Sequence, residues 1–375
     1  MNAGADWIRG RLAPPSAGSR PRVVIDTDAA NEIDDQFALA WALLSPAKLD
    51  VLAVYAAPYS FEHRRREMLR ARALRDAIAR GASDAATALP WDHELLEQHA
   101  ARIERLERAG HTLESIAGWP IFCTPQEGMQ RSEAEIRRVF AALGLDAAGR
   151  VFAGSTAYLP GQGVPPPSPA TEHLIAAARA TPPDGPPLYV VAIGCPTNVA
   201  SALLQASDIA RHVVVVWTSG WPSHAPHVNF SLNLEQDLAA SRVLFASGVP
   251  LVYLPGFHVG AQLRLSLPEV EAHVAKAGAI GALLHALYLA NPLAPFGGFD
   301  VHAPGFSWVI WDLINIAWLI EPAWVPSTLV STPALGDDRR WIARGPGAPP
   351  MREAHAVARD AIFGDLFAAL AHAPR

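Results

Sequence analysis

The sequence predicts an α/β protein whose core is an open, doubly wound and mostly parallel sheet carrying a helical insertion. Two observations predict this class. Short β-branched runs alternate with stretches of helical composition, which is typical of βαβ units joined by right-handed crossovers. Polar residues also gather where the apolar runs end, and ligands of open parallel sheets bind outside the carboxyl ends of the strands.

Composition narrows the class of protein before any motif is considered. The 375 residues are 50% hydrophobic and 18% charged, which excludes a disordered chain. The formal net charge of −6 argues against a general nucleic-acid binder. The chain opens without an apolar run typical of a signal sequence, and Asp312 and Asn315 interrupt the late apolar stretch from Trp308. Because Cys123 and Cys195 make no disulfide framework, we expect a cytoplasmic protein.

The first elements form one βαβ unit. Residues 1–20 end in a segment rich in proline and glycine, and we expect them to be a flexible arm. Residues 22–25 are a β-branched run that fits a buried parallel strand. An acidic loop over 26–35 separates this strand from a helix over 36–44, and a second strand follows at 49–55.

An Arg-rich segment then interrupts the alternation of strands and helices. Residues 63–80 and 91–110 are amphipathic and rich in charge, so they predict a helical hairpin inserted at about 62–118. A pair of solvated helices is the simpler interpretation, and a lid or an oligomer contact is the alternative. We expect residues 21–375 to form a single domain that carries this insertion.

The βα alternation returns after the insertion. Each later apolar run is short, and several end in polar residues that could line a site. The expected strands lie at 150–154, 188–193, 212–217 and 249–254, and the expected helices lie at 171–180 and from 199 onward.

Five carboxylates follow the first strand within ten residues. Asp26, Asp28, Glu32, Asp34 and Asp35 would repel one another strongly in a buried site unless a cation lay among them. Oxygen ligands of this kind select Ca²⁺ or Mg²⁺ over zinc. One carboxylate could instead cap the helix that follows, but a cap needs only one. The cluster therefore predicts a site for a hard cation.

Two common acidic or phosphate-binding motifs are excluded here. A calcium-binding EF-hand loop needs a glycine at its sixth position, and residues 28–33 contain none. A phosphate-binding P-loop needs the pattern Gly-x-x-x-x-Gly-Lys after the strand, and this pattern is also missing.

Other motifs follow the acidic cluster in order along the chain. Residues 22–44 combine a strand, Asp-Thr-Asp, a turn and an Asp-Asp pair that opens a helix. Later come Glu-Gly-Met-Gln-Arg-Ser at 127–132, Ile-Gly-Cys-Pro-Thr-Asn at 193–198, Asn-Leu-Glu-Gln-Asp at 233–237 and Trp-Asp at 311–312. The set resembles the inosine-uridine-type nucleoside N-ribohydrolases, in a divergent bacterial branch. The resemblance covers most of the chain outside the Arg-rich hairpin and implies the fold of that family.

The resemblance also implies a mechanism and a set of site residues. In the family, Ca²⁺ holds the ribose 2′- and 3′-hydroxyls and the attacking water, and one carboxylate takes the proton from that water. Asp26 is expected to orient the ligands from behind. The implied metal ligands are Asp28, Asp35, the backbone carbonyl of Thr197, and Asp312, and the implied general base is Asp34.

The expected sugar and base contacts depart from the family pattern. Asn233 matches the family's sugar-binding asparagine, but Ser231, with Asn229 nearby, stands where the family has a glutamate that contacts the ribose. Trp311 stands where many members have a histidine that protonates the leaving base, and an indole can stack but cannot act as an acid. The turn at 29–33 is also longer than the family's usual three residues. The histidines that could supply a proton instead are His224, His227 and His302.

We expect calcium-dependent hydrolysis of the N-glycosidic bond of a ribonucleoside or related N-riboside. The expected partner is that small molecule, without nucleic acid or membrane, and the expected assembly is a homodimer or homotetramer. A non-catalytic sugar- or nucleoside-binding protein that retains the metal site is one alternative. A phosphatase with an Asp26-Thr-Asp28 nucleophile is another, although the two lysines, Lys48 and Lys276, do not follow strands as that chemistry requires.

Overall fold

The computed structural model describes residues 3–16, 18–81, 92–161, 163–345 and 347–374. Its centre is a sheet of eight strands in the order β3-β2-β1-β4-β5-β6-β12-β9. Every neighbouring pair is parallel except β12 and β9, which are antiparallel at one edge. The predicted fold class is therefore confirmed. The strands are β1 (Arg22–Thr27), β2 (Asp50–Ala56), β3 (Val151–Ala153), β4 (Leu188–Ala192), β5 (Val213–Ser219), β6 (Leu251–Pro255), β9 (Ser327–Ser331) and β12 (Pro350–Ala354).

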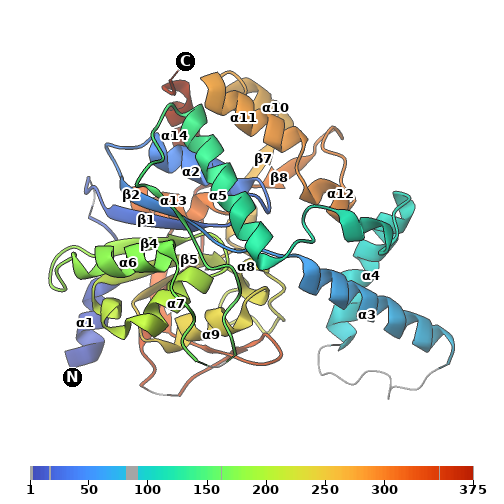
Figure 1. Cartoon of the computed structure of the whole chain (residues 1–375), viewed down its shortest axis with the longest axis horizontal. Coiled ribbons are helices and arrows are strands. Elements are labelled where there is room, and N and C mark those ends of the chain that lie inside the picture. The colour runs from blue at the N-terminus through green and yellow to red at the C-terminus, as the bar shows by residue number, and fades with distance from the viewer. Residues whose placement is uncertain (1–2, 17, 82–91, 162, 346, 375) are drawn as a thin grey trace.

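Helices cover both faces of this sheet, as Figure 1 shows. Because side chains alternate along a strand, Val23 and Ile25 of β1 pack into one apolar layer and Val24 packs into the other. One face carries α2 (Asp34–Leu43), α5 (Pro125–Ala142), α11 (Gly278–Leu289), α13 (Leu313–Ile320) and α14 (Arg359–Ala371), and the other carries α6 (Pro169–Arg179), α7 (Thr197–Gln205) and α9 (Leu238–Ala246).

The strand order reverses between β1 and β4, and this position matters for the site. The chain runs from β1 to β2 on one side, whereas β4 and the later strands lie on the other side of β1. Loops that leave β1 and β4 therefore diverge and open a crevice at the carboxyl ends of these strands. The acidic loop after β1 lies at this crevice.

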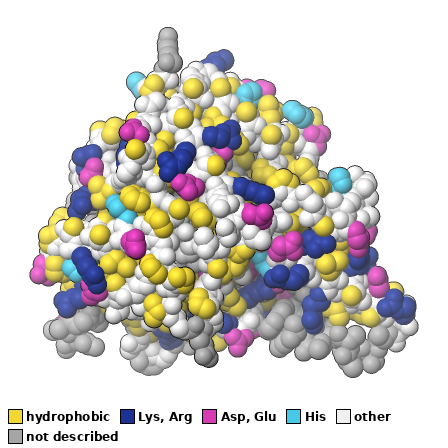
Figure 2. All heavy atoms as spheres, in the orientation of Figure 1, with side chains coloured by type: hydrophobic (Ala, Val, Ile, Leu, Met, Phe, Trp, Pro, Cys, Tyr) yellow, Lys and Arg dark blue, Asp and Glu magenta, His cyan; other side chains and the backbone are white. Residues whose placement is uncertain are grey.

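The Arg-rich segment forms a hairpin of two helices beside the sheet. Helices α3 (Glu62–Ala79) and α4 (Asp92–Arg108) enclose a separate apolar cluster that also includes Phe296 of α12 (Leu293–Gly297). In Figure 1 this hairpin projects to the right of the sheet, and Figure 2 shows basic and acidic side chains mixed over it. The first expected residue of the second helix, Trp91, lies outside the described residues.

The first residues differ from the expected loose arm. Helix α1 (Ala3–Arg11) begins the described chain, and Leu12 after it is fully buried. Ile8 and Leu12, one helical turn apart, both pack against the core, and Arg11 Nη1 donates a hydrogen bond to the Gly185 carbonyl (2.7 Å). A flexible arm was expected because the segment ends in proline and glycine and its apolar face is only one helical turn long.

The remaining elements are short. Two small antiparallel ladders flank the main sheet, and single helical turns join the larger elements. The ladders are β7 (Arg264–Ser266) with β8 (Ser307–Val309) and β10 (Ala334–Leu335) with β11 (Trp341–Ile342), and the turns are η2 (Ser115–Gly118), η3 (Ser207–Arg211), α8 (Leu232–Glu235), η4 (Gly260–Gln262), α10 (Leu267–Glu269), η5 (Val270–Val274) and η6 (Pro322–Trp324).

Among the described residues, one stretch is long and apolar enough to cross a membrane by length and composition. This stretch, Gly278–Gly297, includes α11 and α12, and its most apolar window is 44% buried in the structure. A core helix of a globular protein passes the same test, so the stretch is weak evidence for a membrane span.

Candidate active site

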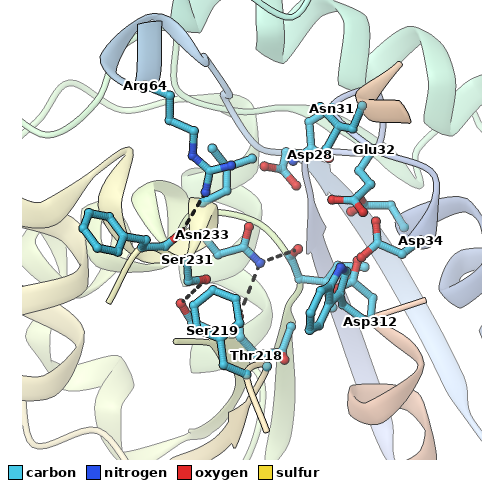
Figure 3. Close-up of a pocket in the computed structure, with 18 residues that line it drawn as sticks. Asp28, Asn31, Glu32, Asp34, Arg64, Thr218, Ser219, Ser231, Asn233 and Asp312 are labelled. Atoms are coloured by element: carbon cyan, nitrogen blue, oxygen red, sulfur yellow. Dashed lines mark hydrogen bonds between the residues drawn. The ribbon is translucent and has the colours of Figure 1, made fainter. Parts of the chain in front are cut away.

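A hollow opens at the crevice where the strand order reverses. Segments that follow four neighbouring strands line it, namely those after β1, β4, β5 and β6. Helices α3, α8 and α12 and the two residues before α13 add further lining residues. Figure 3 shows the side chains that point into it. The lining residues are Asp28, Asn31, Glu32, Asp34, Asp35, Arg64, Ile193, Thr218, Ser219, Phe230, Ser231, Leu232, Asn233, Gly256, Phe257, Leu293, Trp311 and Asp312.

Three buried aspartates converge in this hollow from two helices. Asp34 and Asp35 are the first residues of α2, and Asp312 directly precedes α13. Each offers a carboxylate oxygen, and these oxygens all lie within 4.8 Å of one another. Helix N-termini tolerate negative charge, and both helices present that end to the hollow. The structure thus brings together acidic residues that lie far apart in the sequence.

Asp28 lies beside this group and is held in place from two sides. Its Oδ2 accepts a hydrogen bond from Gln236 Nε2 (3.2 Å), whereas its Oδ1 is buried without a partner among the described residues. Gly194 fits closely against it, because a Cβ atom at this position would lie 2.8 Å from Asp28 Cγ. An unsatisfied buried carboxylate oxygen is costly, so Asp28 Oδ1 is free to bind a cation.

Electrostatics favours a cation among these groups. Burial, followed by repulsion from neighbouring carboxylates, raises the pKa values of Asp28, Asp34 and Asp312 well above their usual range. Burial raises the pKa of Asp35 and of Glu32 to about 7 in each case. Within the described part of the chain, none of the four aspartates forms an ion pair with Lys or Arg. These residues fit a bound metal ion, since an oxygen-only set suits a hard cation.

Asp26 lies behind the hollow and does not line it. Its Oδ1 accepts a hydrogen bond from Asn198 Nδ2 (2.8 Å), and the same asparagine receives the backbone N–H of Ser155 (2.8 Å). Burial raises the pKa of Asp26 to about 7. This position is compatible with the expected supporting role, which stays a prediction.

Thr197 begins α7 and is buried, but it is not among the lining residues. Its Oγ1 donates a hydrogen bond to Asp237 Oδ2 (2.6 Å), which also accepts the backbone N–H of Leu159 (2.9 Å). The part of this loop that lines the hollow is Ile193. The expected ligand role of the Thr197 carbonyl therefore stays a prediction.

Two of the three expected sugar contacts line the hollow. Asn233 Nδ2 donates to the carbonyls of Ile193 (3.0 Å) and Thr218 (3.3 Å), which orients the amide oxygen, and Ser231 Oγ accepts from Ser219 Oγ (3.0 Å).

Asn229, the third expected sugar contact, is placed differently by the structure. Its side chain is fully buried, Oδ1 accepts from the Trp221 backbone (2.7 Å), and Nδ2 donates to the Arg339 carbonyl (2.8 Å). Its amide therefore holds a loop and does not line the hollow, and the expected contact with substrate stays a prediction.

Three aromatic side chains also line the hollow. Trp311 lines it as expected, and its ring lies 6.1 Å from that of Phe257 in an edge-to-face arrangement. Phe230 contributes a third aromatic surface. Among the described residues, no histidine lines the hollow, so His224, His227 and His302 are not brought to the site.

Several lining residues were missed by the sequence reasoning. Glu32 belongs to the acidic cluster, and its Oε1 accepts a hydrogen bond from Trp308 Nε1 (2.6 Å). Its position in the lengthened turn could have marked it as a site residue. Arg64 carried no such signal, because it is one of many arginines in the hairpin and only tertiary packing brings it to the hollow.

Comparisons with known proteins identify the chain. The family model described as inosine-uridine preferring nucleoside hydrolase matches residues 23–345. With this match, the fold and its acidic hollow define a hydrolase that acts on N-glycosyl bonds. Within that class, the chain belongs to the inosine-uridine preferring nucleoside hydrolase family. A comparison with curated proteins finds no match.

Solved structures share the fold at low sequence identity. A purine-preferring ribonucleoside hydrolase from Gardnerella vaginalis is 17% identical, with 93% of this chain and 98% of that chain covered and a TM-score of 0.60. An inosine-uridine preferring nucleoside hydrolase from Bacillus anthracis is 13% identical, with 94% and 99% covered and a TM-score of 0.52. The type III effector protein XopQ, in complex with adenosine diphosphate ribose, is 14% identical, with 99% and 98% covered and a TM-score of 0.52. At these identities the likeness shows the fold alone.

Proposed function

We propose that the protein hydrolyses the N-glycosidic bond of a ribonucleoside or related N-riboside in a calcium-dependent reaction that releases ribose and a free base. The observation that carries this proposal is the convergence of Asp34, Asp35 and Asp312, whose oxygens lie within 4.8 Å of one another in a buried hollow. Membership of the nucleoside hydrolase family supplies the reaction type.

The metal would be held by oxygen atoms alone. We assign Asp28, Asp35 and Asp312 as side-chain ligands and the carbonyl of Thr197 as a backbone ligand. When bound, Ca²⁺ would orient the ribose diol and lower the pKa of the attacking water. The unpartnered Oδ1 of Asp28 supports this assignment because a cation would satisfy it.

Asp34 is the proposed general base. It lies in the hollow beside the assigned ligands, where its carboxylate can accept a proton from the attacking water. A water molecule that attacks C1′ from the side of Asp34 displaces the base from the opposite face. Because no second carboxylate then forms a covalent intermediate, we expect inversion at C1′.

Departure of the base depends on the aromatic part of the hollow. Trp311 and Phe257 offer surfaces on which a planar leaving group can stack, but neither can donate a proton. Without a histidine among the described lining residues, the proton comes from solvent or the base leaves as an anion. We therefore expect good leaving groups, such as the nitrophenolate of a 4-nitrophenyl riboside, to react faster than adenine.

The direct experiment is a panel of ribonucleosides incubated with protein and Ca²⁺, with free ribose and free base both measured. Release of the two in equal amounts is the expected result. If calorimetry shows that a nucleoside binds but no product forms over a day, the result would instead favour a non-catalytic binding protein. The departures from the family pattern at Ser231 and Trp311 are the reason for this alternative. The phosphatase alternative is not supported, because its nucleophile, Asp26, does not line the hollow.

The assembly of the protein is a separate prediction. We still expect a homodimer or homotetramer, and light scattering coupled to size-exclusion chromatography measures it directly.

A further inference from the structure

Arg64 introduces a positive charge into an otherwise acidic hollow. It projects from α3 of the hairpin, and Figure 3 shows it beside Ser231 and Asn233, across the hollow from Asp34 and Asp312. Its Nε donates to Glu235 Oε1 (2.6 Å) and its Nη2 to the Phe230 carbonyl (2.8 Å). These two bonds fix the guanidinium, and its third nitrogen, Nη1, forms no hydrogen bond with the residues that the structure describes, so it is left for a ligand. Only 12% of the side chain is exposed.

The carboxylates behind Arg64 do not fully neutralise its positive charge, because they also pair with a second arginine. Arg339 bonds to Glu235 (2.9 Å) and also pairs with Glu67, so the two buried glutamates already share a second arginine. Arg102 adds a third, and its Nε and Nη1 are buried without a partner among the described residues. Burial, and then repulsion from Arg64, lowers the pKa of Arg102 to about 9. Within this group three arginines face two glutamates, and Glu32 of the hollow is a further carboxylate that Arg64 attracts. The group behind the hollow therefore carries one more positive charge than negative charges, not counting Glu32.

Two histidines adjoin the same group. His63 Nε2 lies 3.1 Å from Glu235, and His99 Nε2 lies 3.4 Å from Glu67. An excess of buried positive charge beside a hollow is costly unless an anion binds there.

The position of Arg64 indicates which part of a substrate it would meet. Its Nη2 bonds to the carbonyl of Phe230, which directly precedes Ser231. Ser231 stands where the family resemblance places a glutamate that contacts the ribose. The chain therefore lacks a negative group at this point and supplies a guanidinium close by. The acidic group that would hold the ribose diol lies on the opposite side of the hollow, where it would repel a phosphate.

We propose that the substrate carries a phosphate group on the ribose O5′, and that Arg64 is the residue that recognises it. This inference rests on the proposed function and narrows its substrate class to ribonucleoside 5′-monophosphates and similar phosphorylated N-ribosides. Water adds to C1′ as the C1′–N bond breaks, the base takes the bonding electrons and a proton, and ribose 5-phosphate is released. The remaining nitrogen of Arg64, Nη1, can donate a charge-assisted hydrogen bond to a phosphate oxygen.

The first test measures binding without catalysis. Calorimetry in the presence of Ca²⁺ compares ribose 5-phosphate, ribose and inorganic phosphate as ligands of the whole protein. We expect ribose 5-phosphate to bind at least about 10-fold more tightly than ribose. Equal affinity for the two sugars, or no binding of ribose 5-phosphate, would overturn the inference. Tight binding of inorganic phosphate with no gain from the sugar would also overturn it.

Variants then assign the preference to one side chain. In Arg64→Gln the preference for ribose 5-phosphate should fall by about 10-fold or more, whereas ribose binding should change little. Arg66→Gln is the matched control, because Arg66 is exposed and lies on the same helix. Arg64→Lys keeps the charge and serves if the glutamine variant fails to fold, and it should retain part of the preference. Equal weakening of both sugars in the Arg64 variants would mean that Arg64 only supports the fold of the hollow.

Hydrolysis separates this inference from the proposed function. Matched pairs of nucleosides and their 5′-monophosphates are compared by release of base. A higher kcat/KM for the monophosphates in wild type, lost in Arg64→Gln, is the expected result. If nucleosides are hydrolysed as well as their monophosphates, the proposed function stands and the phosphate inference fails. If neither class is hydrolysed, the proposed function fails, and the binding comparison still decides whether Arg64 recognises phosphate.

Discussion

Asp35 lies in the first turn of α2 and Asp312 directly precedes α13, yet their carboxylate oxygens lie within 4.8 Å of each other in a buried hollow. Two such groups cannot both stay ionised in a low-dielectric site without a counter-charge. This pair therefore ties the acidic loop after the first strand to the last part of the chain that lines the site. The predictions below depend on that connection.

Asp34→Asn should abolish turnover and leave calcium binding intact. Loss of a general base costs about 10²- to 10⁴-fold in rate, whereas the assigned ligands Asp28, Asp35 and Asp312 remain. Steady-state release of ribose measures turnover, and calorimetric titration with Ca²⁺ measures calcium binding. Asp337→Asn is a control, since that side chain is 93% exposed and does not line the hollow. Near-normal rates in Asp34→Asn would show that Asp34 is not the general base. The variant Asp28→Ala, in contrast, should lose both turnover and calcium binding.

Calcium should stabilise the folded protein through the same site. A ligand that binds only the folded state at 100 times its Kd adds about 2.7 kcal/mol to the free energy of unfolding. Differential scanning calorimetry after chelation and after return of Ca²⁺ measures this gain. We expect Asp312→Asn to lose the gain without unfolding, because the asparagine keeps the size of the side chain. An equal rise in Tm for the variant and wild type would place the calcium elsewhere.

Stability should fall as pH rises, because of Asp26. The ordinary pKa of an aspartate is 3.8, and burial raises that of Asp26 to about 7, so the folded state holds a proton that the unfolded state has released. The associated stability is complete below about pH 4 and is lost as pH approaches about 7, by up to about 4 kcal/mol. In Asp26→Asn, the free energy of unfolding should depend less on pH between about pH 4 and 7, and the variant should be more stable than wild type at pH 8. Urea unfolding at several pH values measures both effects. An unchanged slope would contradict the prediction.

Gly194→Ala should weaken calcium binding by at least about 10-fold. The added Cβ would lie 2.8 Å from Asp28 Cγ and 3.1 Å from Asp28 N, so the carboxylate must move. Calorimetric titration with Ca²⁺ measures the change. Gly364→Ala in α14 is the control, because nothing lies within 4 Å of its Cβ position and alanine favours a helix by up to about 1 kcal/mol. Wild-type calcium affinity in Gly194→Ala would show that Asp28 is not a ligand.

The sequence predicted the parts of the molecule that depend on local patterns. The parallel sheet followed from short β-branched runs, and the acidic hollow followed from carboxylates at the end of the first of them. Asp312 could be placed only through the family resemblance, because nothing in its local sequence shows that α13 points its N-terminus at α2.

The sequence did not predict contacts that depend on tertiary packing. Arg64 reaches the hollow because the hairpin packs against α8 and α12, and its neighbours Arg65 and Arg66 look the same in the sequence. Asn229 looked available for substrate, but the Trp221 and Arg339 backbones take both ends of its amide. The helix at the N-terminus was hidden because its buried face is only one turn long.

The hairpin has an apolar centre of its own, separate from the two layers that sandwich the sheet. It still contacts the acidic loop, because Ala30 packs against this apolar centre, as do Leu232 of α8 and Leu293 of α12. Because the hairpin delivers Arg64, the proposed phosphate contact and the proposed bond-breaking carboxylates lie on different parts of the fold. Grafting a different hairpin onto the same sheet is thus a direct route to altered selectivity.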